Sequence, residues 1–171
     1  MEQILQQLVP ITDEYNSESI FNLLGEYYKS GNDDWKKYCY WNDKFYTRNL
    51  ILKNDLFEVM LICWKRGHES PIHDHSKQHC WLLVLKGAVE EISYKQLDDN
   101  NLKPMDTNIY NNGTAVHTDE DLDWHKIKSL DETVTLHIYS KPIDYCQIYD
   151  TKENQIKRVK TTYHTIDTIK Q

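Results

Sequence analysis

From residue 45 onward, apolar side chains tend to recur at every second position, in short segments separated by turn residues. We expect strands over residues 45–52, 57–64, 71–75, 80–86, 89–97, 124–130, 133–140 and 146–150. Clusters of Asp, Asn and Gly at 98–101 and 111–113 predict tight turns between strands. A period of two is typical of strands that bury one face, and many short strands at this spacing predict a β-sandwich or β-barrel.

The segment before residue 43 has a helical period instead. After Ser17, apolar side chains lie three or four positions apart, at Ile20, Leu23, Leu24 and Tyr27. This stripe predicts an amphipathic helix that begins near the serine. A shorter helix is expected before it, over residues 4–8.

The length of 171 residues suits a single domain. No internal repeat and no linker rich in Gly, Pro or Ser divides the sequence. We therefore predict one domain over residues 1–171, mainly β, with short N-terminal helices in segment 1–42 and a β-barrel in segment 43–171.

Charge and composition restrict the partners. Asp and Glu outnumber Lys and Arg by 27 to 20, which gives a formal net charge of −7, so we expect neither nucleic acid nor an anionic membrane as a partner. The apolar runs are too short to span a bilayer, and the N-terminus lacks the pattern of a secretory signal. The four cysteines are scattered and form no CxxC pair, which argues against a disulfide scaffold. We expect a cytoplasmic monomer.

The most informative stretch contains two histidines. His73 and His75 lie two positions apart on a predicted strand, so both side chains point to the same side. Two imidazoles that converge in this way can hold a divalent metal ion. An isolated motif of two such histidines more often contains one surface histidine and one hydrogen-bonded core histidine, because short motifs recur by chance.

The spacing around these histidines resembles the first motif of the cupin superfamily. The matching residues, separated by five, one, four and six positions, are Gly67, His73, His75, Cys80 and Gly87. Most cupins have a glutamate ligand at the position of Cys80. A second cupin motif supplies one histidine from a later strand, and His125 stands at that place. The resemblance implies a cupin jelly-roll β-barrel with a metal ion on His73, His75 and His125.

The missing glutamate changes the chemistry of such a site. Three neutral imidazoles leave the metal ion with its double positive charge. Three octahedral positions stay open, which suits an anionic ligand that brings its own donor atoms. The softness of the metal and its ligands favours a thiolate substrate bound to iron. Zinc, however, also accepts three histidines.

Further segments resemble the cysteine dioxygenase family of iron-dependent cupins. They are 46–49 (YTRN), 63–64 (CW), 67–68 (GH), 73–75 (HDH), 79–80 (HC), 133–140 (TVTLHIYS) and 144–146 (DYC). The resemblance runs from about Tyr46 to His164, which is most of the chain. It implies an Fe(II) enzyme that oxidises L-cysteine with both atoms of O2 to cysteine sulfinate.

The resemblance also implies roles for single residues. Arg48, assisted by Tyr46, corresponds to the arginine that holds the substrate carboxylate. Tyr139 corresponds to the active-site tyrosine, oriented by His137 and by Thr135, which stands where the family usually has serine. We expect His137 to act through the tyrosine and not as a metal ligand.

A thioether between Cys80 and Tyr139 is implied as well. The alternatives from the residues alone stay open: Cys80 as a buried free thiol, Arg48 paired with a structural carboxylate, and strand 133–140 with its polar face in water. The isomer of the Ser140–Lys141 peptide bond is also open, because a cis bond there would not precede proline.

Three other functions remain possible at this point. They are a dioxygenase of another small thiol such as 3-mercaptopropionate, an isomerase or decarboxylase with zinc or manganese, and a non-oxidative metal-binding cupin. The 3-mercaptopropionate group lacks an arginine at the Arg48 position and has one nearer the C-terminal strands. This sequence has none between Tyr139 and Lys157, which favours cysteine.

Overall fold

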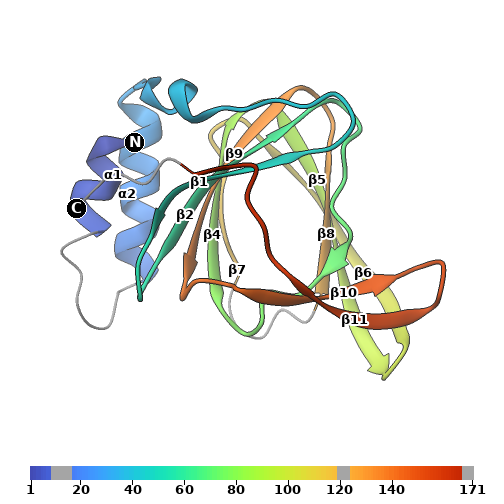
Figure 1. Cartoon of the computed structure of the whole chain (residues 1–171). Helices are drawn as coiled ribbons and strands as arrows, with labels where there is room; N and C mark the ends of the chain where they lie inside the picture. Colours follow the sequence, from blue (N-terminus) through green and yellow to red (C-terminus); the bar gives the residue numbers. More distant parts are fainter. Residues whose placement is uncertain (9–16, 119–123, 167–171) are drawn as a thin grey trace.

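The computed structural model describes residues 1–8, 17–118 and 124–166. Within these residues two six-stranded β-sheets lie face to face, and the helices cover the outer side of one of them (Figure 1). We call the sheet beneath the helices sheet A and the other one sheet B. The predicted mainly β fold with short N-terminal helices is confirmed. The barrel consists of two sheets that, over the described residues, are not joined into one closed hydrogen-bonded cylinder.

The strands of each sheet are not neighbours in sequence. Sheet A has the order β12-β1-β2-β9-β4-β7, with β1 (Thr47–Lys53), β2 (Glu58–Trp64), β4 (His79–Lys86), β7 (Ala115–Thr118), β9 (Thr133–Ser140) and β12 (Thr165–Ile166). Sheet B has the order β11-β10-β3-β8-β5-β6, with β3 (Ile72–His73), β5 (Ala88–Asp98), β6 (Asn101–Asn111), β8 (Trp124–Ser129), β10 (Tyr145–Asp150) and β11 (Gln155–Lys160). The chain passes back and forth between the sheets, as in a jelly roll.

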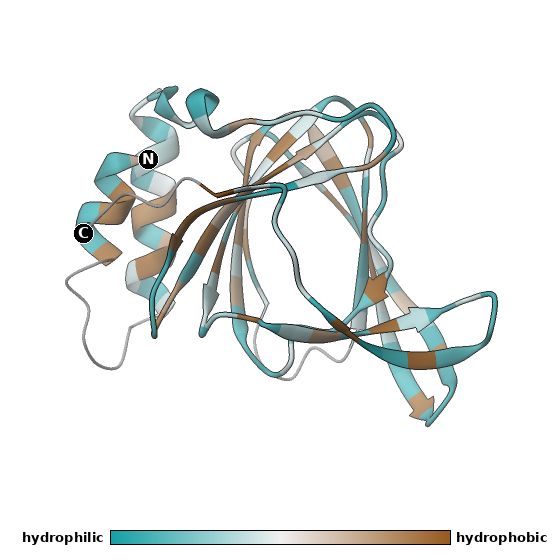
Figure 2. Cartoon of the chain, viewed as in Figure 1, coloured by the Kyte–Doolittle hydropathy of each residue, from teal (hydrophilic) through white to brown (hydrophobic). Residues whose placement is uncertain are grey.

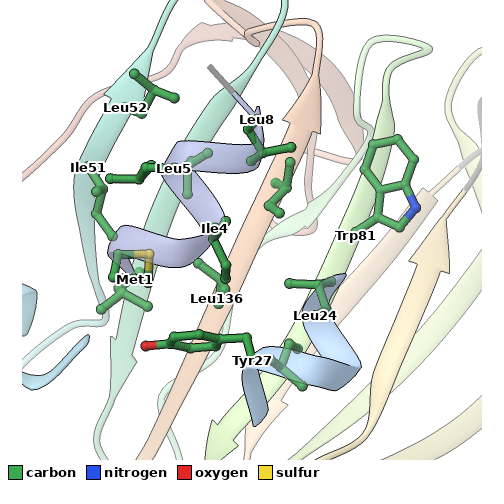
Figure 3. Packing of buried hydrophobic residues seen from close by; sticks show 14 of the residues in the cluster. Met1, Ile4, Leu5, Leu8, Leu24, Tyr27, Ile51, Leu52, Trp81 and Leu136 are labelled. Carbon is green, nitrogen blue, oxygen red and sulfur yellow. The ribbon is translucent and has the colours of Figure 1, made fainter. Parts of the chain in front are cut away.

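The N-terminal segment packs on sheet A. It contains α1 (Glu2–Leu8), α2 (Ser17–Lys29) and a 3₁₀-helix (Asp34–Tyr38). The predicted stripe on α2 is buried, and Figure 3 shows Leu24 and Tyr27 among the side chains between the helices and the strands. The Trp81 indole N–H donates to the Ser17 hydroxyl at 3.1 Å, which ties the start of α2 to β4.

Two apolar clusters lie on the two faces of sheet A. The cluster under the helices includes Trp81, Leu136 and Ile138, and the cluster between the sheets includes Met60, Ile62 and Val84. Figure 2 shows hydrophobic residues along the strands of sheet A and on the helices that face them. Sheet A is therefore buried on both faces, which is why β2 and β9 are buried at every position.

The central strand β9 separates its two kinds of side chain. Val134, Leu136 and Ile138 belong to the cluster under the helices. Thr135, His137 and Tyr139 are buried as well, by 95% or more of their surface, and by alternation they face sheet B. The interior placement of this polar face is thus confirmed, and the alternative of a water-facing strand is wrong, because sheet B covers it.

One prediction about β1 is wrong. The alternation expected over residues 45–52 would place Tyr46, Arg48, Leu50 and Leu52 on one face. The pairing of β1 with β2 shifts between Leu50 and Leu52, so Ile51 and Leu52 both join the cluster under the helices. A β-bulge of this kind inserts one residue and breaks the period of two.

Several strands lack a clear alternating pattern, and the sequence did not predict them. The longest is β6, most of whose residues are exposed; it pairs with β5 to form the long hairpin at the lower right of Figure 1. The turns predicted at 98–101 and 111–113 do lie at the ends of β6. The single domain over 1–171 stays a prediction, since 9–16, 119–123 and 167–171 lie outside the described residues. No described helix is long and apolar enough to cross a membrane.

Candidate metal centre

Three histidines come together between the sheets. His73 lies on β3 and His75 just after it, while His125 lies on β8, directly opposite His73 in the strand register. One nitrogen from each ring lies within 4.8 Å of those of the other two. The predicted trio is thus brought together in space. His79, from the matching segment 79–80, contacts His117 and stacks on Trp81 instead.

The geometry of the cluster fits one metal ion. His75 Nε2 and His125 Nε2 are 2.9 Å apart. Two nitrogens each about 2.1 Å from one ion, at a right angle, would be separated by about 3.0 Å. The ring centroid of His73 and that of His75 each lie 4.6 Å from the ring centroid of His125. The three side chains therefore surround a common point.

Backbone and carboxylate acceptors fix the orientation of two rings. His125 Nδ1 donates to Glu91 Oε1 at 2.6 Å, and His73 Nδ1 donates to the Pro71 carbonyl oxygen at 3.0 Å. Because both acceptors lack a proton, each ring must carry its hydrogen on Nδ1, which leaves Nε2 free to bind a metal. The second oxygen of Glu91 accepts a hydrogen bond from the Tyr110 hydroxyl at 2.8 Å.

Burial favours the neutral form of two of the imidazoles, His73 and His75. Removal from water, together with the neighbouring His125, lowers the pKa of His73 to about 3 and lowers the pKa of His75 well below its usual value. Burial alone would raise the pKa of Glu91, but the hydrogen bond from His125 outweighs it and the pKa of Glu91 is lowered. His73 and His75 thus offer neutral nitrogen donors, as metal binding requires, and the Glu91 carboxylate nearby stays charged.

A chain of hydrogen bonds runs along the inner face of sheet A to Tyr139. The Trp64 indole N–H donates to the Thr135 hydroxyl at 2.9 Å, and this hydroxyl contacts His137 Nε2 at 2.9 Å. His137 Nδ1 lies 3.3 Å from the Tyr139 hydroxyl oxygen. The indole can only donate, so the Thr135 oxygen accepts from it, and the Thr135 proton can then go to His137 Nε2; in that tautomer His137 Nδ1–H donates to Tyr139. The hydroxyl proton of Tyr139 is then left to point elsewhere.

Cys80 lies beside that hydroxyl. Cys80 on β4 is the direct register partner of Tyr139 on β9, and the Cys80 thiol and the Tyr139 hydroxyl are in hydrogen-bonding contact. Burial raises the pKa of Cys80 and also that of Tyr139. The His75 and Tyr139 rings pack edge to face with centroids 5.5 Å apart. The cysteine–tyrosine pair therefore borders the histidine cluster.

Arg48 lines the same cavity as the three histidines, His137 and Tyr139. Its Nη2 lies 3.6 Å from Glu58 Oε1, so the alternative of a structural carboxylate partner is realised in part. Glu58 is fully buried, and its other oxygen accepts from the Ile143 N–H at 3.0 Å. Arg48 Nε and Glu58 Oε1 have no hydrogen-bond partner among the described residues. The guanidinium thus keeps donors for a ligand.

Tyr46, the second predicted substrate residue, also lines this cavity. Its ring stacks on Trp64 with centroids 4.5 Å apart. Every site residue predicted from the sequence therefore borders the cavity or contacts a residue that does. The Ser140–Lys141 peptide bond at the end of β9 is cis.

The chain matches the cysteine dioxygenase type I family over residues 1–152. The chain belongs to this family. The cysteine dioxygenase type 1 of Danio rerio is 31% identical over 172 residues, which covers 95% of this chain and 85% of that protein. The Rattus norvegicus protein of the same name is 32% identical over 160 residues and covers 90% of this chain and 79% of that protein. Family membership and the three-histidine cluster make this chain an oxidoreductase of the dioxygenase class with a metal-binding site.

Solved structures agree with the cupin fold. A protein with a double-stranded β-helix domain from Klebsiella pneumoniae has a TM-score of 0.56 at 11% identity and covers 70% of this chain and 97% of that chain. An RmlC-like cupin from Desulfovibrio desulfuricans has a TM-score of 0.51 at 18% identity and covers 66% of this chain and 97% of that chain. At such low identity these similarities concern the fold alone.

Sequence reasoning missed three residues of the site. Glu91 on β5 contacts His125, and Glu58 on β2 pairs with Arg48. The third residue, Trp64, begins the hydrogen-bond chain to Tyr139. A charged residue on a strand that is otherwise buried, as Glu58 is within 57–64, was an available signal. Nothing in the spacing linked Glu91 to His125, because that contact depends on the pairing of β5 with β8.

We predict that Glu91→Gln weakens metal binding about 10- to 100-fold, because the charged partner that orients His125 is lost. The affinity for Fe(II) is measured by anaerobic titration against a competing chelator. Glu90→Gln is the matched control: it removes the same charge one position away, on the opposite side of β5. Equal affinities for the two variants would contradict the role of Glu91.

Proposed function

We propose that this protein oxidises L-cysteine with O2 to cysteine sulfinate, with Fe(II) held by His73, His75 and His125. The observation that carries the proposal is the Arg48 guanidinium in the same cavity as the three imidazoles. The cavity then offers both a metal ion for a thiolate and a planar cation for a carboxylate. A small thiol that carries a carboxylate matches this arrangement.

Iron is the metal that this proposal requires. When bound, iron supplies the redox chemistry that allows O2 to oxidise a thiolate, which zinc cannot do. The donor set supports a divalent ion with open positions, because the three ligands are neutral nitrogens and Cys80 replaces the usual cupin glutamate. Glu91 lies behind His125 and adds negative charge without taking up a coordination position.

Arg48 binds the carboxylate of the substrate. A guanidinium presents parallel N–H groups that match a carboxylate in two hydrogen bonds. Glu58 Oε1 lies 3.6 Å from Arg48 Nη2, and the unpaired Arg48 Nε is a donor that a ligand can use. Tyr46 lines the cavity beside Arg48 and is kept in place by stacking on Trp64.

Tyr139 directs a proton into the cavity. Because His137 Nδ1–H donates to its oxygen, the Tyr139 hydroxyl is free to donate to substrate or to Cys80. Burial lowers the pKa of His137 to about 3, and the nearby Arg48 adds to this effect. His137 is therefore a neutral relay that orients Tyr139. Thr135 takes the place of the family's serine without loss of the hydrogen bond.

The nearest alternative is a dioxygenase of another thiol acid such as 3-mercaptopropionate. The remaining arginines support cysteine instead: Arg158 lies on β11, with its guanidinium 4.3 Å from the Tyr145 ring, and neither it nor Arg66 lines the cavity. The cytoplasmic location and the monomeric state stay predictions.

The function is tested with an oxygen electrode and anaerobically reconstituted protein. We expect rapid O2 uptake with L-cysteine and one cysteine sulfinate formed for each O2 consumed. Cysteamine and 3-mercaptopropionate should give much slower uptake, because each lacks one of the two groups that flank the cysteine thiol. Preferred oxidation of 3-mercaptopropionate would reassign the substrate. If none of the three thiols stimulates O2 uptake, the proposal is excluded.

Arg48→Ala should lose cysteine oxidation and keep iron. Removing one partner of a desolvated ion pair costs about 3–5 kcal/mol, which is roughly a 10²- to 10⁴-fold loss in kcat/KM. The slow oxidation of cysteamine, which has no carboxylate, should change far less. Arg48→Lys keeps the charge opposite Glu58 but lacks the planar fork, so it separates binding geometry from unfolding. Near-normal kcat/KM for cysteine in both variants would show that Arg48 does not bind the carboxylate.

We also predict a thioether between Cys80 Sγ and a ring carbon of Tyr139, formed in part of the molecules during turnover. Their cross-strand pairing and side-chain contact support it. The bond removes two hydrogens, so intact mass spectrometry should resolve two species that a thiol reductant does not interconvert. Cys80→Ser should give the unmodified mass alone, whereas Cys146→Ser should keep both. Wild-type protein that remains unmodified after many turnovers would contradict the prediction.

A further inference from the structure

A second hollow lies on the outside of the molecule, away from the histidine cluster. Its volume is about 520 Å³, and none of its lining residues lines the metal cavity. It is bordered by Cys39, Trp35, Trp41, Lys36, Lys86 and Glu132. We call it the Cys39 groove. Its size suits a small organic molecule.

The thiol in this groove contacts a second thiol. Cys63, buried on β2, lies within hydrogen-bonding distance of Cys39, which is half-buried and accessible from the groove. Asn49 Nδ2 donates to Cys63 Sγ at 3.5 Å, and Cys39 Sγ lies 3.8 Å from the Trp35 carbonyl oxygen. One thiol of the pair is therefore open to solutes and the other is shielded. Neither has a role in the proposed reaction at the histidine cluster.

The surroundings of the two thiols shift their pKa values in opposite directions. The hydrogen bond from Cys63 and the positive charge of Lys86 lower the pKa of Cys39, although burial opposes them. The same contact with Cys39, followed by burial, raises the pKa of Cys63. Cys39 is thus the better nucleophile of the two. Once its sulfur is bonded to another sulfur, Cys39 no longer carries the charge that suppresses ionisation of Cys63.

We propose that Cys39 and Cys63 form a redox-active thiol pair that reduces small disulfides bearing amino-acid charges, of which cystine is the simplest. The Cys39 thiolate attacks one sulfur of the disulfide and releases one thiolate, which leaves a mixed disulfide on Cys39. Cys63 then loses its proton, attacks Cys39 Sγ and releases the second thiolate. Two protein thiols are oxidised to one disulfide, and one small disulfide is reduced to two thiols.

The walls of the groove support this occupant. Lys86 Nζ lies 2.8 Å from Glu132 Oε1 and 5.9 Å from the Trp41 ring. Glu132 Oε2 also accepts from Lys65 Nζ at 2.9 Å, so two ammonium groups share one carboxylate and the rim keeps positive charge for the carboxylate of an amino acid. The indole rings offer apolar surface for its carbon–sulfur chain. A peroxide could oxidise the same thiols, but it would need none of these groups.

The reaction is tested with cystine as the probe and with holoprotein under argon, so that no O2 chemistry occurs. Wild-type protein should lose two hydrogens in a form that dithiothreitol reverses, and peptide mapping should find Cys39 linked to Cys63. Cys63→Ser should stop at the mixed disulfide and become heavier by one cysteinyl group on Cys39. Cys39→Ser should form neither product. Reversal by dithiothreitol separates this disulfide from the Cys80–Tyr139 thioether.

Cys146, also half-buried, is the matched control. Burial raises its pKa, so Cys146→Ser should react as the wild type does. Modification of Cys146 with an unmodified Cys39 peptide would overturn the proposal, and so would a mixed disulfide on wild-type Cys39 that Cys63 never resolves. If Cys63→Ser does not fold, Cys63→Ala and the wild-type peptide map test the same two steps. The readout is a mass, so its failure is independent of cysteine oxidation.

Discussion

The burial of both faces of β9 is the constraint on which the rest of this structure depends. Its odd and even side chains need opposite surroundings, since one set is aliphatic and the other consists of hydroxyl, imidazole and phenol groups. The helices cover the aliphatic face. Sheet B covers the polar face, where each buried polar group must then find a partner or carry a free-energy cost. The hydrogen-bond chain from Trp64 to Tyr139 follows directly from this requirement.

The same requirement explains where negative charge lies around the histidines. Cys80 occupies the position at which most cupins place a glutamate ligand, and it faces Tyr139 across the strand pair. A carboxylate is nevertheless present nearby: Glu91 accepts the hydrogen bond from His125. In the proposed metal site this charge would lie behind His125 and not on the metal, so it would orient a ligand and leave coordination positions open to substrate. Glu58 has a similar relation to Arg48, which it holds without using all of its donors.

Two pairs of sulfur-containing contacts, Cys80 with Tyr139 and Cys63 with Cys39, lie on opposite faces of sheet A. Cys80 lies on the inner face with Tyr139, whereas Cys63 lies under the helical segment with Cys39. The inner thiol is surrounded by the groups that line the metal cavity. The outer pair shares no wall with that cavity and reaches solvent through a groove with charged rims. One sheet thereby separates the two sulfur chemistries that we propose.

Local pattern was sufficient to predict the helix over 17–29, most strands and the turns around β6, because period and turn chemistry act over a few residues. It also supplied His73 and His75 through their spacing, whereas His125, Arg48, Tyr46 and Tyr139 came from resemblance to known families. Only the tertiary structure decided that the polar face of β9 is interior, since a lone strand does not specify which face is covered. The bulge at Leu50–Leu52, the pairing of Glu91 with His125 and the contact of Cys39 with Cys63 were likewise beyond the sequence. Each depends on register between segments far apart in the chain, and register is fixed by the packing of whole sheets.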